Sequence, residues 1–287
     1  MQLSPEEQAQ RIRYEGLYKR SLLPVMASIE RSVCGCDYGG TSWTTREEAH
    51  EFSALLGLRP GLRLLDIGAG SGWPGLYMAG ISGCDVTLID LPQSALRIAA
   101  ERAVNDRLPG TCWVAVADAA NLPFRDGSFD AISHSDVLCC LREKRAVLAA
   151  CRRVVRRGGS MVFSVISVAP DLTHDDHRRA VENGPEFIEA EADYATLLRQ
   201  TGWTVLDCRD TTNDYMAACR RQLRADEDLK ETLQSAIGAS EFTERRVGWQ
   251  SKLEALRHGL LRREIFVAAA TRVLRLPAST AIQHAVR

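Results

Sequence analysis

The chain has 287 residues, 45% of them hydrophobic, and a formal net charge of −1. That composition is ordinary for a globular protein and excludes the strongly basic surface typical of nucleic-acid or membrane-surface binding. No apolar run approaches a membrane span, the first twenty residues are too charged for a signal peptide, and nine scattered cysteines favour reduced thiols in a cytoplasmic protein.

Helical segments are predicted before the central part of the chain. Ser4-Pro5-Glu6-Glu7 is a capping box with proline at the first helical position, and it predicts a helix to about Arg31. A glycine-containing loop follows over residues 33–44. Thr45-Arg46-Glu47-Glu48 is a second capping box, which opens a helix that ends at Gly57.

From residue 62 the chain alternates apolar strands with amphipathic helices. This alternation predicts a doubly wound α/β fold, in which a parallel sheet carries helices on both faces. A long helical insertion is expected over Thr212–His258, before the last strand. The first expected strand ends at Asp66, and the later ones are Cys84–Asp90, Cys112–Ala117, Phe129–Ser133, Met161–Val168, Trp203–Arg209 and Arg263–Ala270.

The domain organisation follows from this order of elements. We expect an N-terminal helix and lid loop over residues 1–44 and a main domain over 45–271. Helical insertions are expected within the main domain at 170–200 and 212–258, and the tail at 272–287 has no clear assignment.

The stretch Leu64-Leu65-Asp66-Ile67-Gly68-Ala69-Gly70-Ser71-Gly72-Trp73-Pro74-Gly75 is a buried strand that enters a glycine turn and then a helix. Glycines there permit positive φ and close approach of a ligand, and a helix N-terminus supplies backbone donors. The formal G-x-G-x-x-G match is a weak signal for a dinucleotide, because Asp66 stands where that fingerprint has its first glycine. The pattern D-x-G-x-G-x-G resembles motif I of the class I S-adenosylmethionine-dependent methyltransferases.

The resemblance implies a Rossmann-like seven-stranded sheet with an antiparallel last strand, and S-adenosylmethionine as cofactor. In that family the acid at Asp66 anchors the methionine amino group through the turn. An acid at Asp90 is placed to hold the ribose, and one at Asp118 contacts the adenine amino group. The implied cofactor-binding set is Asp66, Gly68, Ala69, Gly70, Gly72, Asp90, Leu91, Asp118, Ala119, Ser133 and His134.

Residues 129–138 correspond to the family's motif IV, and the residues just past its strand usually line the space between the cofactor's methyl group and the substrate. This chain has Ser133-His134-Ser135-Asp136 where base-methylating branches carry Asp/Asn-Pro-Pro-aromatic, which favours a small-molecule substrate. His134 and Asp136 are the candidate catalytic residues for proton handling. The alternative is that His134 bonds only to cofactor or backbone, because an aligned, desolvated approach can suffice for methyl transfer.

The lid loop contains two aromatic residues that could bind substrate. Tyr38 and Trp43 could reach the cofactor or wall off a cationic sulfonium or amine. Alternatively, they pack the N-terminal helix onto the sheet edge.

Two residue clusters could indicate a metal site or thiol chemistry. His174-Asp175-Asp176-His177 follows Thr173 at capping-box spacing, so we expect a helix start and no metal site. Cys139-Cys140 is expected to supply core cysteines, because adjacent side chains usually diverge.

Together these observations predict an enzyme that transfers the methyl group of S-adenosylmethionine to a small-molecule acceptor through an N, O or S nucleophile. The chain resembles the branch that methylates quinones, sarcosine and phosphoethanolamine. No nucleic-acid or membrane partner is expected, and a homo-oligomer is possible. The alternatives are an NAD(P)-dependent oxidoreductase and a non-catalytic S-adenosylmethionine-binding protein.

Overall fold

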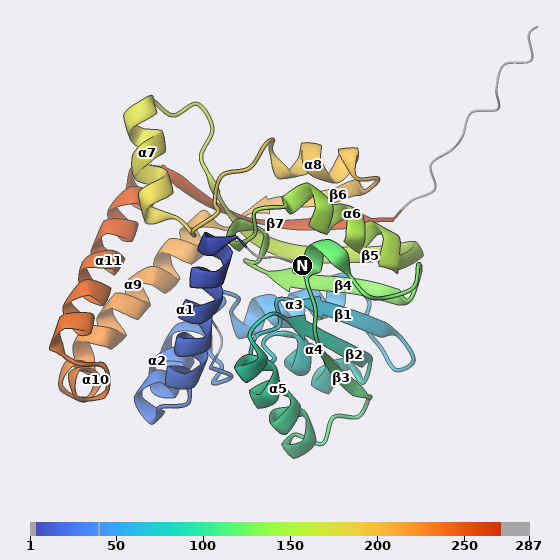
Figure 1. Ribbon diagram of the computed structural model, residues 1–287, viewed down its shortest axis with the longest axis horizontal. Coiled ribbons are helices and arrows are strands. Elements are labelled where there is room, and N and C mark those ends of the chain that lie inside the picture. The colour runs from blue at the N-terminus through green and yellow to red at the C-terminus, as the bar shows by residue number, and fades with distance from the viewer. Residues whose placement is uncertain (1–3, 40, 271–287) are drawn as a thin grey trace, which may run out of the picture.

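A twisted seven-stranded sheet forms the centre of the protein (Figure 1). The structure is a computed structural model that describes residues 4–39 and 41–270. The strand order is β3-β2-β1-β4-β5-β7-β6; β7 is antiparallel to both of its neighbours, and the other pairs are parallel. This topology confirms the predicted fold, including the antiparallel last strand. The strands are β1 (Arg63–Ile67), β2 (Asp85–Asp90), β3 (Cys112–Val116), β4 (Phe129–Ser135), β5 (Val155–Val168), β6 (Thr204–Asp210) and β7 (Leu261–Ala269).

Helices cover both faces of the sheet, as the apolar character of its strands requires. Side chains of α3, α4 and α5 pack with one set of strand residues, including Leu64 and Leu88. Side chains of α6 and α8 pack with the alternate set, including Leu65 and Ile67. These helices are α3 (Arg46–Leu55), α4 (Gly75–Ser82), α5 (Gln93–Asn105), α6 (Lys144–Val154) and α8 (Tyr194–Gln200); short 3-10 turns lie at Ala119–Asn121 (η1) and Leu138–Cys140 (η2).

The remaining helices form a bundle beside the sheet (Figure 1). A small core of its own, which includes Ile29, Ala218, Leu233 and Phe242, joins α2 to the helices inserted before β7. Among the described residues, no helix combines the length and apolarity needed to cross a bilayer. The bundle helices are α1 (Pro5–Ser21), α2 (Pro24–Cys34), α7 (His174–Asn183), α9 (Thr212–Asp228), α10 (Lys230–Ile237) and α11 (Ala239–Arg257).

The N-terminal helix differs from the prediction. The sequence predicts one helix to about Arg31, but the structure has two, separated at Leu22 and Leu23. Pro24 explains the break, because a proline pushes the preceding residue out of the helical region and supplies no N–H. Leu23 accordingly has ψ 135°.

Other boundaries also shift. β5 begins at Val155, earlier than the predicted Met161. The segment after residue 170 contains α7, whose N-cap Thr173 accepts the Asp176 N–H as its spacing predicts. The division into lid, main domain and insertions stays a prediction, and the tail at 272–287 lies outside the described residues.

Candidate active site

The glycine turn after β1 has the backbone geometry that its sequence predicts. Gly68, Gly70 and Gly72 have φ of +65°, +52° and +103°, a region that side chains with a Cβ rarely adopt. The Gly70 N–H points to the end of β2, where it donates to Asp90 Oδ2 at 2.8 Å. The turn is therefore held open by hydrogen bonds to its neighbouring strand.

Asp66 lies beneath the turn, with an exposed fraction of 1%. Its Oδ2 accepts the Gly75 N–H at 3.1 Å, and its Oδ1 accepts the Ser133 hydroxyl at 2.6 Å. Burial raises the pKa of this carboxyl to about 7. Asp66 thus fastens the turn to α4 and β4 from below, and neither Asp66 nor Ser133 is among the residues that line the cavity described next.

A cavity of about 480 Å³ opens above the turn. Its floor is the carboxyl edge of β1, β2 and β4, where ligands bind in doubly wound sheets. Its walls come from α1, α2, the lid loop, residues 184–187, and the helices α9 and α11. Of the predicted cofactor-binding residues, it is lined by Gly68, Ala69, Gly70, Asp90, Leu91 and Asp118.

Asp90 and Asp118, the two acids on the cavity floor, differ in how many hydrogen bonds their carboxylate oxygens accept. Asp90 accepts backbone N–H groups at both oxygens, from Gly70 at 2.8 Å and from Leu91 at 2.7 Å. Burial nevertheless raises its pKa to about 6. Asp118 Oδ1 caps a short 3-10 turn through the Ala120 N–H, but its buried Oδ2 has no hydrogen-bond partner in the described part of the chain. A buried orphan carboxylate oxygen fits a ligand that donates an N–H group.

Helix α1 closes the cavity over the turn. A Cβ built on Gly70 would lie 2.3 Å from the hydroxyl oxygen of Tyr18, a residue with an exposed fraction of 4%. Tyr14, one helical turn earlier, also lines the cavity, and its ring centroid lies 6.3 Å from that of Tyr18. Tyr14 and Tyr18 lie four residues apart and therefore on one helical face, but this spacing does not indicate that the face covers the glycine turn.

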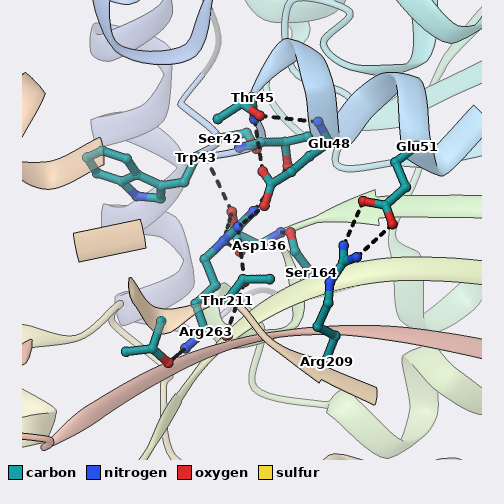
Figure 2. A network of polar contacts seen from close by, with 12 residues as sticks. Ser42, Trp43, Thr45, Glu48, Glu51, Asp136, Ser164, Arg209, Thr211 and Arg263 are labelled. Atoms are coloured by element: carbon teal, nitrogen blue, oxygen red, sulfur yellow. Dashed lines mark hydrogen bonds and ion pairs between the residues drawn. The ribbon is translucent and has the colours of Figure 1, made fainter. Parts of the chain in front are cut away.

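Asp136 lies just past β4 and belongs to a buried ionic network (Figure 2). Arg263 of β7, 1% exposed, donates from Nε to Asp136 Oδ1 at 3.0 Å and from Nη1 to Glu48 Oε1 at 2.7 Å. Asp136 also accepts the Trp43 backbone N–H at 3.3 Å and has φ +55°, unusual for a residue with a side chain. The network therefore ties the lid loop, α3 and β7 to the residues that follow β4.

Comparisons with known proteins agree with this geometry. Residues 65–163, the glycine turn through most of β5, match the profile of a family described as a methyltransferase domain. Over 223 residues the chain is 28% identical to phosphoethanolamine N-methyltransferase 3 of Arabidopsis thaliana, covering 77% of this chain and 45% of that protein. Residues 65–163 are therefore similar to a methyltransferase domain.

Other methyltransferases resemble the chain over a larger share of its length. The chain is 28% identical to 27-O-demethylrifamycin SV methyltransferase of Amycolatopsis mediterranei, covering 66% of this chain and 71% of that one. Its fold is similar to Haemonchus contortus phosphoethanolamine N-methyltransferase 2, solved with phosphomonomethylethanolamine and S-adenosylhomocysteine. The TM-score is 0.74 at 18% identity, over 90% of this chain and 60% of that one. The chain spans less than half the length of the curated plant relatives that it matches first.

His134 departs from its predicted place at the cavity. The side chain is fully buried in β4, where its ring stacks on Phe163 with centroids 4.4 Å apart, and it does not line the cavity. Within the described residues neither ring nitrogen has a hydrogen-bond partner, and burial lowers its pKa to about 3. Side chains alternate between the two faces of a strand, which points His134 into the core instead of toward the ligand.

The two lid aromatics have different surroundings. Trp43 lines the cavity and makes edge-to-face contacts with Tyr215 and Trp249 of the inserted helices. Tyr38, by contrast, is not part of the cavity wall: its ring packs on Trp73, and the Arg102 guanidinium lies 4.3 Å above its centroid. For Tyr38 the structure therefore agrees with the packing alternative.

Two predicted cofactor contacts also lie away from the cavity wall. A Cβ on Gly72 would meet Leu76 and Ala99, so this glycine allows helix packing. Ala119 is buried in the main core. Both support the cavity floor from below.

The inserted helix α11 contributes a cation that the sequence analysis missed. Lys252 lines the cavity, and no hydrogen bond or ion pair joins its ammonium to another described residue. Its Nζ lies 6.0 Å from the ring centroid of Trp249, and burial lowers its pKa. No sequence signal distinguished this lysine from the other charged residues of a long polar insertion.

Proposed function

We propose that this chain is a methyltransferase, which transfers the methyl group of S-adenosylmethionine to a small-molecule acceptor bound in the same cavity. One observation carries the proposal: the cavity is continuous from the glycine turn to the lid and the inserted helices. A cofactor over Gly70 and an acceptor beside Trp43 would therefore share one enclosed space. The small-molecule methyltransferases among its relatives support the same reading.

The residues of the turn fit the cofactor. The unpartnered Oδ2 of Asp118 suits the adenine amino group, and Asp90, held by two backbone N–H groups, keeps lone pairs for the ribose hydroxyls. The absence of a side chain at Gly70 lets Tyr18 of α1 close over the turn, because a Cβ there would lie 2.3 Å from the Tyr18 hydroxyl oxygen. When bound, the cofactor supplies an electrophilic methyl group on a sulfonium.

The rest of the chain aligns the acceptor and excludes water. Asp136 is engaged by Arg263, so it acts by positioning the Trp43 wall and does not serve as a free base. Helix α1 and the α9–α11 insertion close over the cavity, where exclusion of water and alignment can supply several kcal/mol. Methyl transfer to a good nucleophile needs little more than this alignment.

The acceptor class is the finer part of the proposal. Among the described residues Lys252 has no counter-ion, and the cavity that it lines also has aromatic walls. An unpaired buried charge is unfavourable, so it favours an acceptor with an anionic group. The similarity to phosphoethanolamine methyltransferases points to an amine that carries a phosphate.

We also propose that the protein is cytoplasmic. All nine cysteines are free thiols, which suits a cytoplasmic protein. A homo-oligomer and the absence of a nucleic-acid partner stay predictions.

The test combines binding with transfer. Calorimetry is expected to detect S-adenosylhomocysteine binding, and labelled S-adenosylmethionine is expected to methylate phosphoethanolamine faster than ethanolamine. Lys252→Met should remove that preference for the phosphate, while Lys230→Met, at the start of α10 and outside the cavity wall, should leave it intact. Cofactor binding without transfer to any amine, hydroxyl or thiol acceptor would instead indicate a non-catalytic binding protein.

A further inference from the structure

Two adjacent thiols converge at the cavity wall. Cys139 Sγ and Cys140 Sγ both donate to the carbonyl oxygen of Asp136, at 3.2 and 3.6 Å. The expectation that their side chains diverge is therefore wrong. The tight 3-10 turn η2 (Leu138–Cys140) explains the difference, because it brings both thiols over one peptide group.

The two thiols differ in access. Cys140 lines the cavity and also contacts Tyr14, whose hydroxyl oxygen lies 3.4 Å from its Sγ. Cys139 is fully buried directly behind it. A small solute that enters the cavity can reach the first thiol, whereas the second is reachable only through the first.

The hydrogen bonds of the pair make Cys140 the more acidic of the two thiols. Hydrogen bonding with Cys139 and Tyr14 lowers the pKa of Cys140, whereas burial raises the pKa of Cys139. Burial also raises the pKa of Cys34, which lines the same cavity, to about 12 and that of the exposed Cys208 to about 11. Neither exposure, as at Cys208, nor access to the cavity, as at Cys34, is therefore enough to lower the pKa of a thiol in this protein.

We propose that Cys140 and Cys139 form a peroxide-sensitive redox site, in which Cys140 is oxidised first and Cys139 then closes a disulfide. In the first step the Cys140 thiolate attacks one oxygen of a hydroperoxide; an S–O bond forms, the O–O bond breaks, and the leaving oxygen takes up a proton. In the second step Cys139 attacks the sulfenic sulfur; an S–S bond forms, and the hydroxyl leaves with the thiol proton as water. Two thiols are oxidised, and one hydroperoxide is reduced to an alcohol and water.

Because the two cysteines are adjacent in the sequence, their disulfide is expected to be easily reduced and to change the local backbone. Consecutive Cα atoms lie about 3.8 Å apart, closer than the usual disulfide range of roughly 4.4–6.8 Å, so the bond is strained and readily reduced. Ring closure must remodel η2, which follows Val137, and Val137 packs against Gly68 of the glycine turn. Oxidation is therefore expected to weaken cofactor binding, a consequence that rests on the proposed function.

The first test is chemical and does not depend on activity. The reduced full-length protein is treated with hydrogen peroxide, and the tryptic peptide of residues 126–142, which contains both thiols and no other cysteine, is analysed by mass spectrometry. We expect it to lose two hydrogen atoms and to regain them with dithiothreitol. Cys139→Ala, which keeps a small apolar group in the core, should instead stop at a Cys140 sulfenic acid that dimedone traps.

Matched variants complete the design. Cys34→Ser removes another thiol of the same cavity and should leave the oxidation of the 126–142 peptide unchanged. Iodoacetamide should alkylate Cys140 at least about tenfold faster than Cys208 despite the greater exposure of Cys208. An unoxidised 126–142 peptide under conditions that oxidise Cys208, or no trappable sulfenic acid in Cys139→Ala, would overturn the proposal.

The second test addresses the consequence. Oxidised protein should bind S-adenosylhomocysteine at least about tenfold more weakly than reduced protein, and dithiothreitol should restore the affinity. Unchanged affinity after complete disulfide formation would overturn the regulatory consequence while leaving the redox site. Absence of binding even in the reduced protein would refute the proposed function instead.

Discussion

The two halves of the cavity are formed by different parts of the chain: one by a local backbone turn, the other by side chains from distant segments. The proposed cofactor half, comprising the glycine turn with Asp90 and Asp118, uses backbone geometry and the ends of adjacent strands. The proposed acceptor half, comprising Asp136, Trp43 and the walls from α9 and α11, uses side chains that lie far apart in the sequence. The first half tolerates few substitutions, because a turn has few allowed conformations, whereas the second can vary by changing side chains on helices.

The ionic network behind the acceptor half should dominate stability. Arg263→Met leaves Asp136 and Glu48 buried without their cation, so we expect the free energy of unfolding to fall by about 3–5 kcal/mol in urea denaturation. Arg209→Met is the matched control, because Arg209 makes a bidentate but half-exposed pair with Glu51 (Figure 2). Its loss should lower stability by at most about 1 kcal/mol. Equal effects of the two variants would show that the buried network has no special role.

The glycine turn should dominate binding. Gly70→Val places a branched side chain at φ +52° and 2.3 Å from the Tyr18 hydroxyl oxygen, so affinity for S-adenosylhomocysteine should fall by more than about a hundredfold. Gly57→Val is the control, because Gly57 also has positive φ, at +60°, but nothing lies within 4 Å of its added Cβ. It should lower stability by roughly 1–3 kcal/mol and leave affinity unchanged. Calorimetry that finds near-normal affinity for Gly70→Val would place the ligand elsewhere.

The acid at the end of β2 should have an intermediate effect. Asp90→Ala removes a buried hydrogen-bonding carboxylate, and we expect a loss of about 1.5–3 kcal/mol in cofactor affinity, or roughly ten- to a hundredfold. Asp85→Ala at the opposite end of the same strand removes only a bond from the Thr111 N–H, and it should bind normally. Similar affinities for both variants in calorimetry would contradict the assignment of the ribose to Asp90.

The buried carboxyl beneath the turn should make stability depend on pH. The pKa of Asp66 is raised to about 7 in the folded protein, so the folded state binds more protons than the unfolded state between about pH 4 and 7. Its contribution therefore favours folding at the acidic end of that window and is lost as the pH rises through 7. Asp66→Asn should flatten the pH profile of the unfolding free energy measured in urea, and a profile as steep as that of the wild type would refute the burial argument.

The smallest effect is expected at His134. Because its ring nitrogens have no partner among the described residues and its ring stacks on Phe163, His134→Phe should keep turnover within about threefold of the wild type. A loss of about a hundredfold in turnover with unchanged cofactor affinity would instead restore His134 as a general base.

The difference between the halves also explains what the sequence could reveal. The alternation of strands and helices and the pattern around Asp66 are local, so the sheet, the turn and the acids at the strand ends could be predicted. The pairing of Arg263 with Asp136 and the place of Lys252 depend on how distant segments pack, which no local pattern encodes. His134 was expected to face the ligand because the predicted strand ended at Ser133, whereas β4 continues to Ser135 and strand alternation turns this side chain into the core.

The central claim is that one cavity holds the cofactor on the glycine turn and presents its methyl group to the acceptor wall. A crystal structure with S-adenosylhomocysteine tests it most directly. We predict that the adenine amino group lies within hydrogen-bond distance of Asp118 Oδ2, that the ribose hydroxyls contact Asp90, and that the sulfur faces the space beside Trp43 and Asp136. A ligand bound away from Gly70, or with its sulfur directed away from Trp43, would contradict the account.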